Sequence, residues 1–191
     1  QKIKGQIDYS SADKQLEWLR NKNIICKGHP LIFLNPQIMP EWFRNLPYRE
    51  LKQLCLEYIR TTILRFRGQI HIWDVINEAH VQPEAGTGVN GYTKEENVDL
   101  TCEALKAARQ ADPSCFRIVN STGTWSDYYM TNNPLTGQQT VYDYYKMLQS
   151  AGADYEAIGL QFYYSGRDFV ETEREIEKYR DLGKPIHITE S

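Results

Sequence analysis

The chain has 191 residues, a length that suits one domain large enough to build its own core. Its net charge of −3 argues against a nucleic-acid-binding surface and against a polybasic membrane anchor. No apolar stretch approaches the roughly 18 residues that cross a membrane, and no signal-peptide pattern is present. Composition therefore predicts a single domain, residues 1–191, that binds neither nucleic acid nor membrane.

The four cysteines, Cys26, Cys55, Cys102 and Cys115, are widely spaced and form no C-x-x-C pair. Structural zinc sites are usually built from closely spaced pairs, so the spacing does not favour a metal site. Two of the cysteines fall in strand-like runs and two on apolar helix faces. We therefore expect free, buried thiols that pack as small hydrophobic residues, and we predict no metal and no cofactor.

The predicted elements alternate between helix and strand along the whole chain. Ser10 or Ser11 is expected to cap the first helix, and Thr93 followed by Glu96 has the capping-box pattern of the third. Gly183 and Pro185 are typical of the end of the last helix. Helices are predicted over residues 10–22, 48–68, 94–111, 139–151 and 169–183, and strands over 24–34, 70–77, 115–120, 155–163 and 185–190.

This alternation predicts an α/β fold with a parallel sheet, because no hairpin turn joins two strands. A doubly wound dinucleotide fold lacks support, since no G-x-G-x-x-G follows a strand. Polar residues at several strand ends favour a (β/α)8 TIM barrel, whose sites lie at that rim. Five strands do not close an eight-stranded barrel, so we expect the barrel to be incomplete in this chain. The missing barrel segments would then be its partners.

Two carboxylates carry the clearest chemical signal. Glu78 and Glu190 each end an apolar strand, so a parallel barrel would place both at the same rim. Hydrolysis of a glycosidic bond uses two such groups, an acid at the leaving oxygen and a carboxylate at the anomeric carbon. Asn77 is suited to bind a sugar hydroxyl beside them. The alternative is that each glutamate is a solvated strand end.

The motifs around these glutamates resemble those of glycoside hydrolase family 10, the retaining endo-xylanases. "WDVINE" (73–78) resembles the acid/base motif, "HITE" (187–190) the nucleophile strand, "GHPLIF" (28–33) the third strand and "IGLQ" (158–161) the sixth. The resemblance implies a general acid/base, Glu78, and a nucleophile, Glu190, acting by double displacement on internal β-1,4 linkages of xylan. It also implies carboxyl groups about 5–5.5 Å apart and a secreted or periplasmic location.

The same resemblance assigns binding residues and shows departures from the family pattern. It implies that His29, Asn77 and Gln161 bind the sugar, and Asn120 matches more loosely. Phe33 stands where the family has Trp. Tyr163 stands where the family has a histidine that hydrogen-bonds the nucleophile; its hydroxyl is also a donor near neutral pH. We therefore expect the tuning of the nucleophile and the choice of sugar to differ.

Other residues and functions stay open. His80 is predicted to lie on a loop surface, with a hydrogen bond to the substrate as the alternative. His187 is predicted to face the helices as a structural residue, and Asp74 to anchor its strand rather than act as an acid. Rim aromatic residues and one arginine are expected either to stack on sugars or to pack. The alternatives to a xylanase are a retaining hydrolase acting on another β-glycan and a non-catalytic carbohydrate-binding barrel. The rim residues are Trp125, Tyr128, Tyr129, Tyr164 and Arg167.

Overall fold

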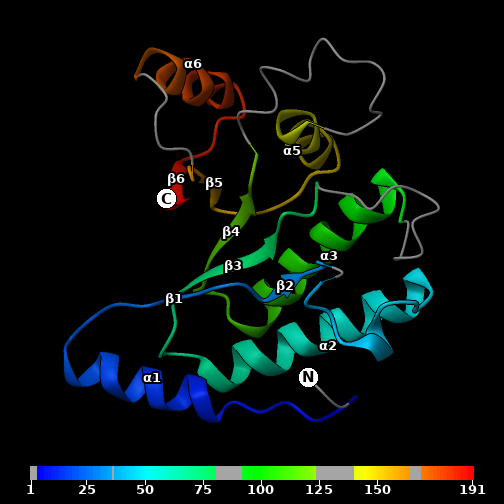
Figure 1. The fold of residues 1–191 in the computed structure, drawn as a ribbon, viewed down its shortest axis with the longest axis vertical. Helices are drawn as coiled ribbons and strands as arrows, with labels where there is room; N and C mark the ends of the chain where they lie inside the picture. Colours follow the sequence, from blue (N-terminus) through cyan, green and yellow to red (C-terminus); the bar gives the residue numbers. More distant parts are fainter. Residues whose placement is uncertain (1–3, 36, 81–91, 124–139, 164–168) are drawn as a thin grey trace.

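One parallel sheet organises the fold, and its strands follow one another in a curved row (Figure 1). The computed structural model describes residues 4–35, 37–80, 92–123, 140–163 and 169–191. The strand order is β1-β3-β4-β5-β6, with β2 also paired to β3. The strands are β1 (Lys27–Gly28), β2 (Ile32–Phe33), β3 (Ile72–Asn77), β4 (Phe116–Ser121), β5 (Ala157–Gln161) and β6 (Ile186–Glu190).

Helices connect successive strands, and α2 and α3 lie side by side against the sheet (Figure 1). Within the part of the chain that the structure describes, no helix combines the length and apolar character needed to cross a membrane. The helices are α1 (Ser10–Asn21), the short 3-10 helix η1 (Glu41–Phe43), α2 (Tyr48–Phe66), α3 (Lys94–Ala111), α5 (Val141–Ser150) and α6 (Phe169–Arg180). Each predicted helix is confirmed, with ends shifted by no more than a few residues.

The direction of the sheet distinguishes between the two α/β architectures. All described strand pairs are parallel, and from β3 onward each strand pairs with the next one along the chain. A doubly wound sheet reverses its strand order at a switch point, whereas a barrel continues in one direction. The described strands therefore form part of a barrel wall, with their carboxyl ends at one rim.

The predicted strand at 24–34 forms two strands of two residues each rather than one. Pro30 has no backbone N–H and interrupts the ladder, and the amide of Leu31 donates instead to the carbonyl of Asp74 at 2.9 Å. Gly28 is required in β1 because a Cβ there would lie 2.0 Å from the ring of Trp73. The interruption leaves His29 at the point where the chain leaves the sheet.

The core lies between the sheet and the helices, and β3 is buried along almost its whole length. This is the pattern of a strand covered on both faces. The cysteines are free, but only Cys55 and Cys115 are buried, whereas Cys26 and Cys102 are half-buried and the prediction for them is wrong. Fully buried apolar residues include Leu51, Ile59, Ile63, Val75, Leu100, Leu105, Val119, Leu148, Ile158 and Leu160.

Two helix starts test the capping predictions. Thr93 and Glu96 form the predicted capping box at α3: the Thr93 hydroxyl accepts from the Glu96 amide, and the Glu96 carboxylate accepts from the Thr93 amide. The predicted serine cap of α1 is wrong, because Tyr9 occupies the N-cap position without a side-chain hydrogen bond. The Asp8 carboxylate satisfies the amide of Ser10 instead, at 2.9 Å.

Candidate active site

The carboxyl ends of β3, β4, β5 and β6 bring the polar strand-end residues together. Asn77 pairs in register with Asn120, and Gln161 pairs with Glu190. Residues paired in register on neighbouring strands point to the same side of a sheet. Four residues that the sequence identified separately therefore share one face at one rim.

Two register shifts determine which side chains reach this face. The β3–β4 register shifts between Asp74 and Ile76, so Asp74 and Asn77 can both face the site although they are three residues apart. The β5–β6 register shifts beside Gln161, and the neighbours Thr189 and Glu190 both contact Asn120. A bulge re-aims side chains that strict alternation would send to opposite faces.

A chain of side-chain amides links the two glutamates. Gln161 Nε2 donates to Glu78 Oε1 at 3.1 Å and to Asn77 Oδ1 at 3.2 Å. Asn120 Nδ2 donates to the same Asn77 oxygen at 2.8 Å and to Glu190 Oε1 at 2.6 Å. The three amide side chains are at most 4% exposed, so the link between Glu78 and Glu190 is held within the protein.

Thr189 and Gly159 fix the amide of Asn120. The Thr189 hydroxyl donates to Asn120 Oδ1, which leaves Nδ2 facing Asn77 and Glu190. Gly159 lies beneath this amide, and a Cβ there would come within 2.7 Å of Asn120 Oδ1. The orientation of an amide that donates to residues of both β3 and β6 thus depends on one hydroxyl and one missing side chain.

Tyr163 contacts the other oxygen of Glu190. Its hydroxyl donates to Glu190 Oε2, while the side chain as a whole is 56% exposed. The hydrogen bond to Glu190, followed by burial and by the negative charges of Glu190 and Glu78, raises the pKa of Tyr163 to about 12. The phenol therefore keeps its proton, and remains a donor, throughout the neutral range.

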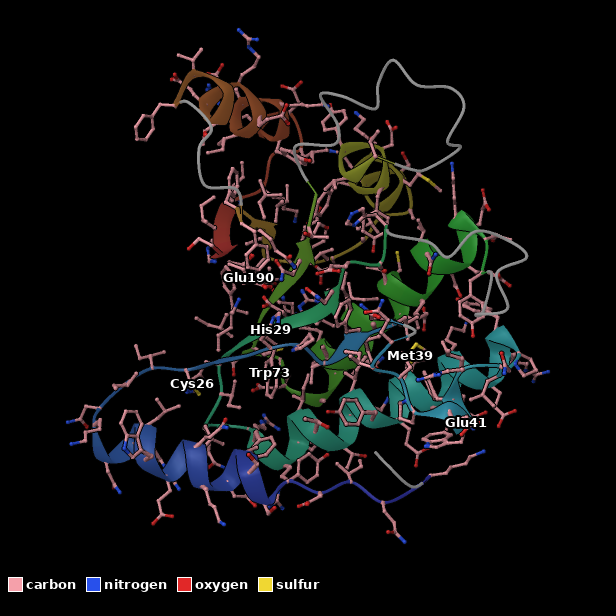
Figure 2. All side chains as sticks on the ribbon, in the orientation of Figure 1. Cys26, His29, Met39, Glu41, Trp73 and Glu190 are labelled. Carbon is pink, nitrogen blue, oxygen red and sulfur yellow. The ribbon has the colours of Figure 1, made fainter. Side chains whose placement is uncertain are left out.

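His29 joins Glu190 to a buried ion pair. Its Nδ1 lies 2.7 Å from Asp74 Oδ2, which also accepts from Lys27 Nζ at 2.6 Å. His29 Nε2 lies 3.6 Å from Glu190 Oε1, and Figure 2 shows His29 between Trp73 and Glu190. The hydrogen bond to Asp74 is the main cause of the raised pKa of His29, which favours a positive charge beside Glu190.

The same cluster has the residue types of a metal site. Ligand atoms of His29, Asp74 and Glu190 lie within 4.8 Å of one another. The Lys27 ammonium already occupies the shared Asp74 oxygen. Because Lys27 supplies a positive charge there, the arrangement is explained as an ion-pair network, and we assign no metal to it.

Glu78 adopts an unusual backbone conformation. Its φ of 55° lies in the left-handed region, which few residues other than glycine occupy. Its amide donates to the carbonyl of Asn120 at 2.8 Å, which ties the end of β3 to β4. Non-glycine residues in this region cost about 1–3 kcal/mol each and persist where the surrounding structure holds them.

Two histidine predictions are wrong. His80 is buried rather than exposed on a loop; burial lowers its pKa to about 4, and its ring lies beside Tyr144. His187 does not face the helices, because it pairs in register with Gly159, which itself pairs with Asn120 of the site; its ring stacks on Phe116 at 5.3 Å. The bulge in the β5–β6 pairing invalidates a simple alternation count on this strand.

The remaining site predictions fall into three groups. Asp74 is buried and bonded to His29 and Lys27, which agrees with an anchoring role. Phe33 pairs in register with Asn77, and it lines an apolar cavity of about 370 Å³ together with Trp42 and other residues of the β2–α2 connection. The rim residues Trp125, Tyr128, Tyr129, Tyr164 and Arg167 lie outside the described residues.

Three residues that contribute to the site were not predicted from the sequence: Lys27, Gly159 and Thr189. Lys27 had a usable signal, because it lies two residues before His29 within the predicted strand 24–34, where alternation places both side chains on the same face. Gly159 and Thr189 act through Asn120. Their roles depend on the strand register, which the sequence does not display.

Comparison with known proteins gives a consistent result. The sequence profile of "Glycosyl hydrolase family 10" matches residues 1–191. Endo-1,4-beta-xylanase A of Thermotoga neapolitana is 31% identical over 197 residues, which cover 98% of this chain and 18% of that protein. Exoglucanase XynX of Acetivibrio thermocellus is 29% identical over 206 residues, which cover all of this chain and 18% of that protein.

A solved structure agrees with these sequence matches. Xylanase 10B from Thermotoga petrophila RKU-1, in complex with xylobiose, superposes with a TM-score of 0.74 at 26% identity. The match covers 97% of this chain and 55% of that one. The chain thus spans about half of that structure and less than a fifth of the two sequence relatives, and the incomplete (β/α)8 barrel predicted from the sequence is confirmed.

Proposed function

Because the chain belongs to glycosyl hydrolase family 10, we propose that Glu78 and Glu190 hydrolyse internal β-1,4 linkages of xylan with retention of configuration. The observation that carries this proposal is the amide chain through Gln161, Asn77 and Asn120, which connects the two carboxylates within one rim. A pair of solvated strand ends would not need buried side chains to hold them.

In the first step, Glu78 acts as general acid and Glu190 as nucleophile. A Glu190 oxygen bonds to the anomeric carbon while the glycosidic bond breaks, and the leaving oxygen takes the proton of Glu78. Asn77 lies between the two carboxylates and can donate its amide N–H to the neighbouring sugar hydroxyl. Such a bond strengthens in the transition state.

In the second step, Glu78 changes from general acid to general base. Its carboxylate takes a proton from water, the water oxygen bonds to the anomeric carbon, and the bond to Glu190 breaks with its electron pair returning to the carboxylate. Two inversions at one carbon give net retention.

The surroundings of the two glutamates support this division of roles. Glu190 accepts hydrogen bonds at both oxygens, from Asn120 and from Tyr163, and has His29 nearby. An environment of hydrogen-bond donors suits a carboxylate that begins the cycle ionised, because an ionised carboxylate only accepts hydrogen bonds. Glu78 Oε1 accepts a hydrogen bond from the neutral amide of Gln161, and its second oxygen can carry the proton.

Xylan is the substrate best supported, because a similar protein is named an endo-1,4-beta-xylanase and a similar structure binds xylobiose. A polymeric substrate also implies a secreted or periplasmic enzyme. A retaining hydrolase for another β-glycan is the second candidate, since another relative is named an exoglucanase. A non-catalytic carbohydrate-binding barrel is disfavoured because binding alone requires neither glutamate.

The test uses the full-length protein with xylan and with 4-nitrophenyl β-xylobioside. Glu190→Ala should abolish turnover. Added azide should restore the release of nitrophenol, and the sugar product should be the α-glycosyl azide. Glu78→Ala should slow xylan hydrolysis by about 10²–10⁴-fold, and azide should then give the β-azide. Glu177→Gln, an exposed change on α6, serves as the matched control.

Four results would contradict the proposal or change its substrate. Unchanged turnover in Glu190→Ala removes the nucleophile assignment. Release of the inverted anomer in an NMR time course removes the double displacement. Binding of xylan without hydrolysis, in a folded full-length protein, favours the carbohydrate-binding alternative. Faster hydrolysis of a β-glucan than of xylan selects the second candidate.

A further inference from the structure

The hydrogen-bond ladder between β3 and β4 ends beside Glu78. Asn77 and Asn120 form the last pair of the register, and the amide of Glu78 donates to the carbonyl of Asn120 at 2.8 Å. If a parallel ladder continues, the next amide to donate lies two positions further along and reaches the carbonyl two positions further along the neighbouring strand. In this chain those two residues are His80 and Thr122.

The side chain of His80 reaches the carbonyl that its own amide would reach in a longer ladder. Burial lowers the pKa of His80 to about 4, against a smaller opposing effect of a hydrogen bond to the backbone of Thr122. A bond that raises the pKa of a histidine comes from an acceptor, so the ring donates to the Thr122 carbonyl. Within the described residues, the buried Nδ1 of His80 has no hydrogen-bond partner, so the donor is Nε2. Because the ring is neutral in the neutral pH range, the proton on Nε2 is its only one.

Packing holds the His80 ring in this position. The ring lies beside Tyr144 of α5, with centroids 6.2 Å apart, and both side chains are buried. Thr101 of α3 donates to the carbonyl of Asn97, so its oxygen accepts from the Tyr144 hydroxyl at 2.6 Å. Residues of two helices thus fix the ring, and the ring fixes the chain that leaves β3.

Glu78 is therefore held on both sides. Its amide is bonded to β4, and residue 80 is bonded to the chain that continues β4, with only Ala79 between them. The φ of 55° at Glu78 is unfavourable for a residue other than glycine and persists where the surroundings hold it. Without the bond from His80, this turn is free to relax, and the carboxyl group that it carries moves with it.

We propose, building on the proposed function, that His80 is a positioning residue for Glu78: by donating to the Thr122 carbonyl it holds the left-handed turn that aims the Glu78 carboxyl group. The aim of that group matters in both steps of hydrolysis. In the first step the Glu78 proton passes to the leaving oxygen, and in the second step the carboxylate takes a proton from water. His80 itself exchanges no proton with the substrate.

Substrates with different leaving groups test this role in the full-length protein. Phenyl β-xylobioside needs an acid at its leaving oxygen, whereas 2,4-dinitrophenyl β-xylobioside releases a stable anion and hardly needs one. In His80→Phe, kcat/KM for the phenyl substrate should fall by about tenfold to a hundredfold, because a catalytic group is displaced. The value for the dinitrophenyl substrate should change little. A merely structural role lowers both values equally, and that result would overturn the proposal.

Two variants serve as references. His80→Gln places an amide N–H near the position of Nε2 and should recover most of kcat/KM for the phenyl substrate. His71→Phe removes an exposed histidine just before β3 and should leave both substrates unaffected. Equal losses in His80→Gln and His80→Phe overturn the proposal, and so does a selective loss of the phenyl substrate in His71→Phe.

The tautomer of His80 tests the contact without using activity. In wild type labelled with ¹⁵N-histidine, two-bond ¹⁵N–¹H correlations should show a proton on Nε2 at neutral pH, in a resonance that is missing from His80→Gln. A proton on Nδ1 overturns the proposal, and this result decides even where His80→Phe does not fold. Unchanged kinetics in His80→Phe overturn it as well and leave the proposed function intact. Absence of xylan hydrolysis in wild type overturns the proposed function, and this role with it.

Discussion

The hydroxyl of Thr189 donates to Oδ1 of Asn120, and this contact favours the orientation in which the amide nitrogen of Asn120 faces Glu190. Without it the amide could rotate by half a turn and present an oxygen to the Glu190 carboxylate. Two acceptors facing each other repel, so a rotated amide would displace Glu190 from its position.

Thr189→Val should therefore lower turnover while preserving the shape of the side chain. We expect kcat/KM to fall by about tenfold, the value of one hydrogen bond, with little change in Tm. Thr189→Ser keeps the hydroxyl and should retain most of the activity. Equal activity of the valine and serine variants would show that the Thr189 hydroxyl does not orient Asn120.

Gly159→Ala should affect activity more than stability. The added methyl would lie 2.7 Å from Asn120 Oδ1 and 2.8 Å from Ile118 Cγ2, so the amide must shift. Displacements of about 1 Å in a catalytic group can cost about 10²-fold in rate. Gly28→Ala is the matched comparison, because its methyl meets the Trp73 ring and should lower Tm instead. Steady-state kinetics and thermal unfolding of both variants measure these two effects. A Gly159→Ala protein with full activity would contradict the prediction.

Asp74→Asn should change the titration of His29. The Asp74 carboxylate is the main cause of the raised pKa of His29, so its removal should lower the midpoint measured by NMR of the imidazole. A raised pKa contributes stability below the unfolded value of about 6.5, and this contribution is lost as pH rises through the folded value. The difference in stability between wild type and variant should therefore shrink with rising pH. Asp99→Asn, which removes the exposed partner of Lys52, should leave the His29 midpoint unchanged.

His80 should make the protein sensitive to acid. Its pKa is lowered to about 4, so below pH of about 6.5 the unfolded chain takes up a proton that the folded chain does not. The free energy of unfolding should fall by up to roughly 3 kcal/mol between these two pH values. His80→Phe should remove this slope, whereas His71→Phe, at an exposed position, should not. Denaturant titrations at several pH values measure the free energy of unfolding. An equal dependence on pH in wild type and His80→Phe would contradict the prediction.

The alternation of helices and strands could be predicted because it depends on local pattern. β3 is apolar at Ile72, Trp73, Val75 and Ile76 and ends in polar Asn77, so the sequence predicted both its burial and the site at its end. Glu78 and Glu190 could be identified because each ends such a strand. The break at Pro30 in the predicted strand 24–34 was harder to predict. It depends on a tertiary contact, the hydrogen bond from the Leu31 amide to the Asp74 carbonyl of β3.

What could not be predicted depends on register. The bulges beside Asp74 and Gln161 bring residues of odd spacing to one face, and no local pattern announces a bulge. The burial of His80 depends on Tyr144, which lies 64 positions further on and belongs to α5. Such side chains are placed by tertiary packing, which acts after the local preferences of the sequence.

The left-handed backbone of Glu78 has a consequence for how this position can evolve. Glu78→Gly would relieve the strain at φ 55° and should raise Tm, whereas Glu78→Ala would remove the same carboxylate and keep the strain. If the two variants unfold at the same temperature, the strain is absent. Selection for thermal tolerance alone would favour glycine here, whereas the role proposed for Glu78 requires a carboxylate. If that proposed role were lost, residue 78 should drift before the surrounding strand does.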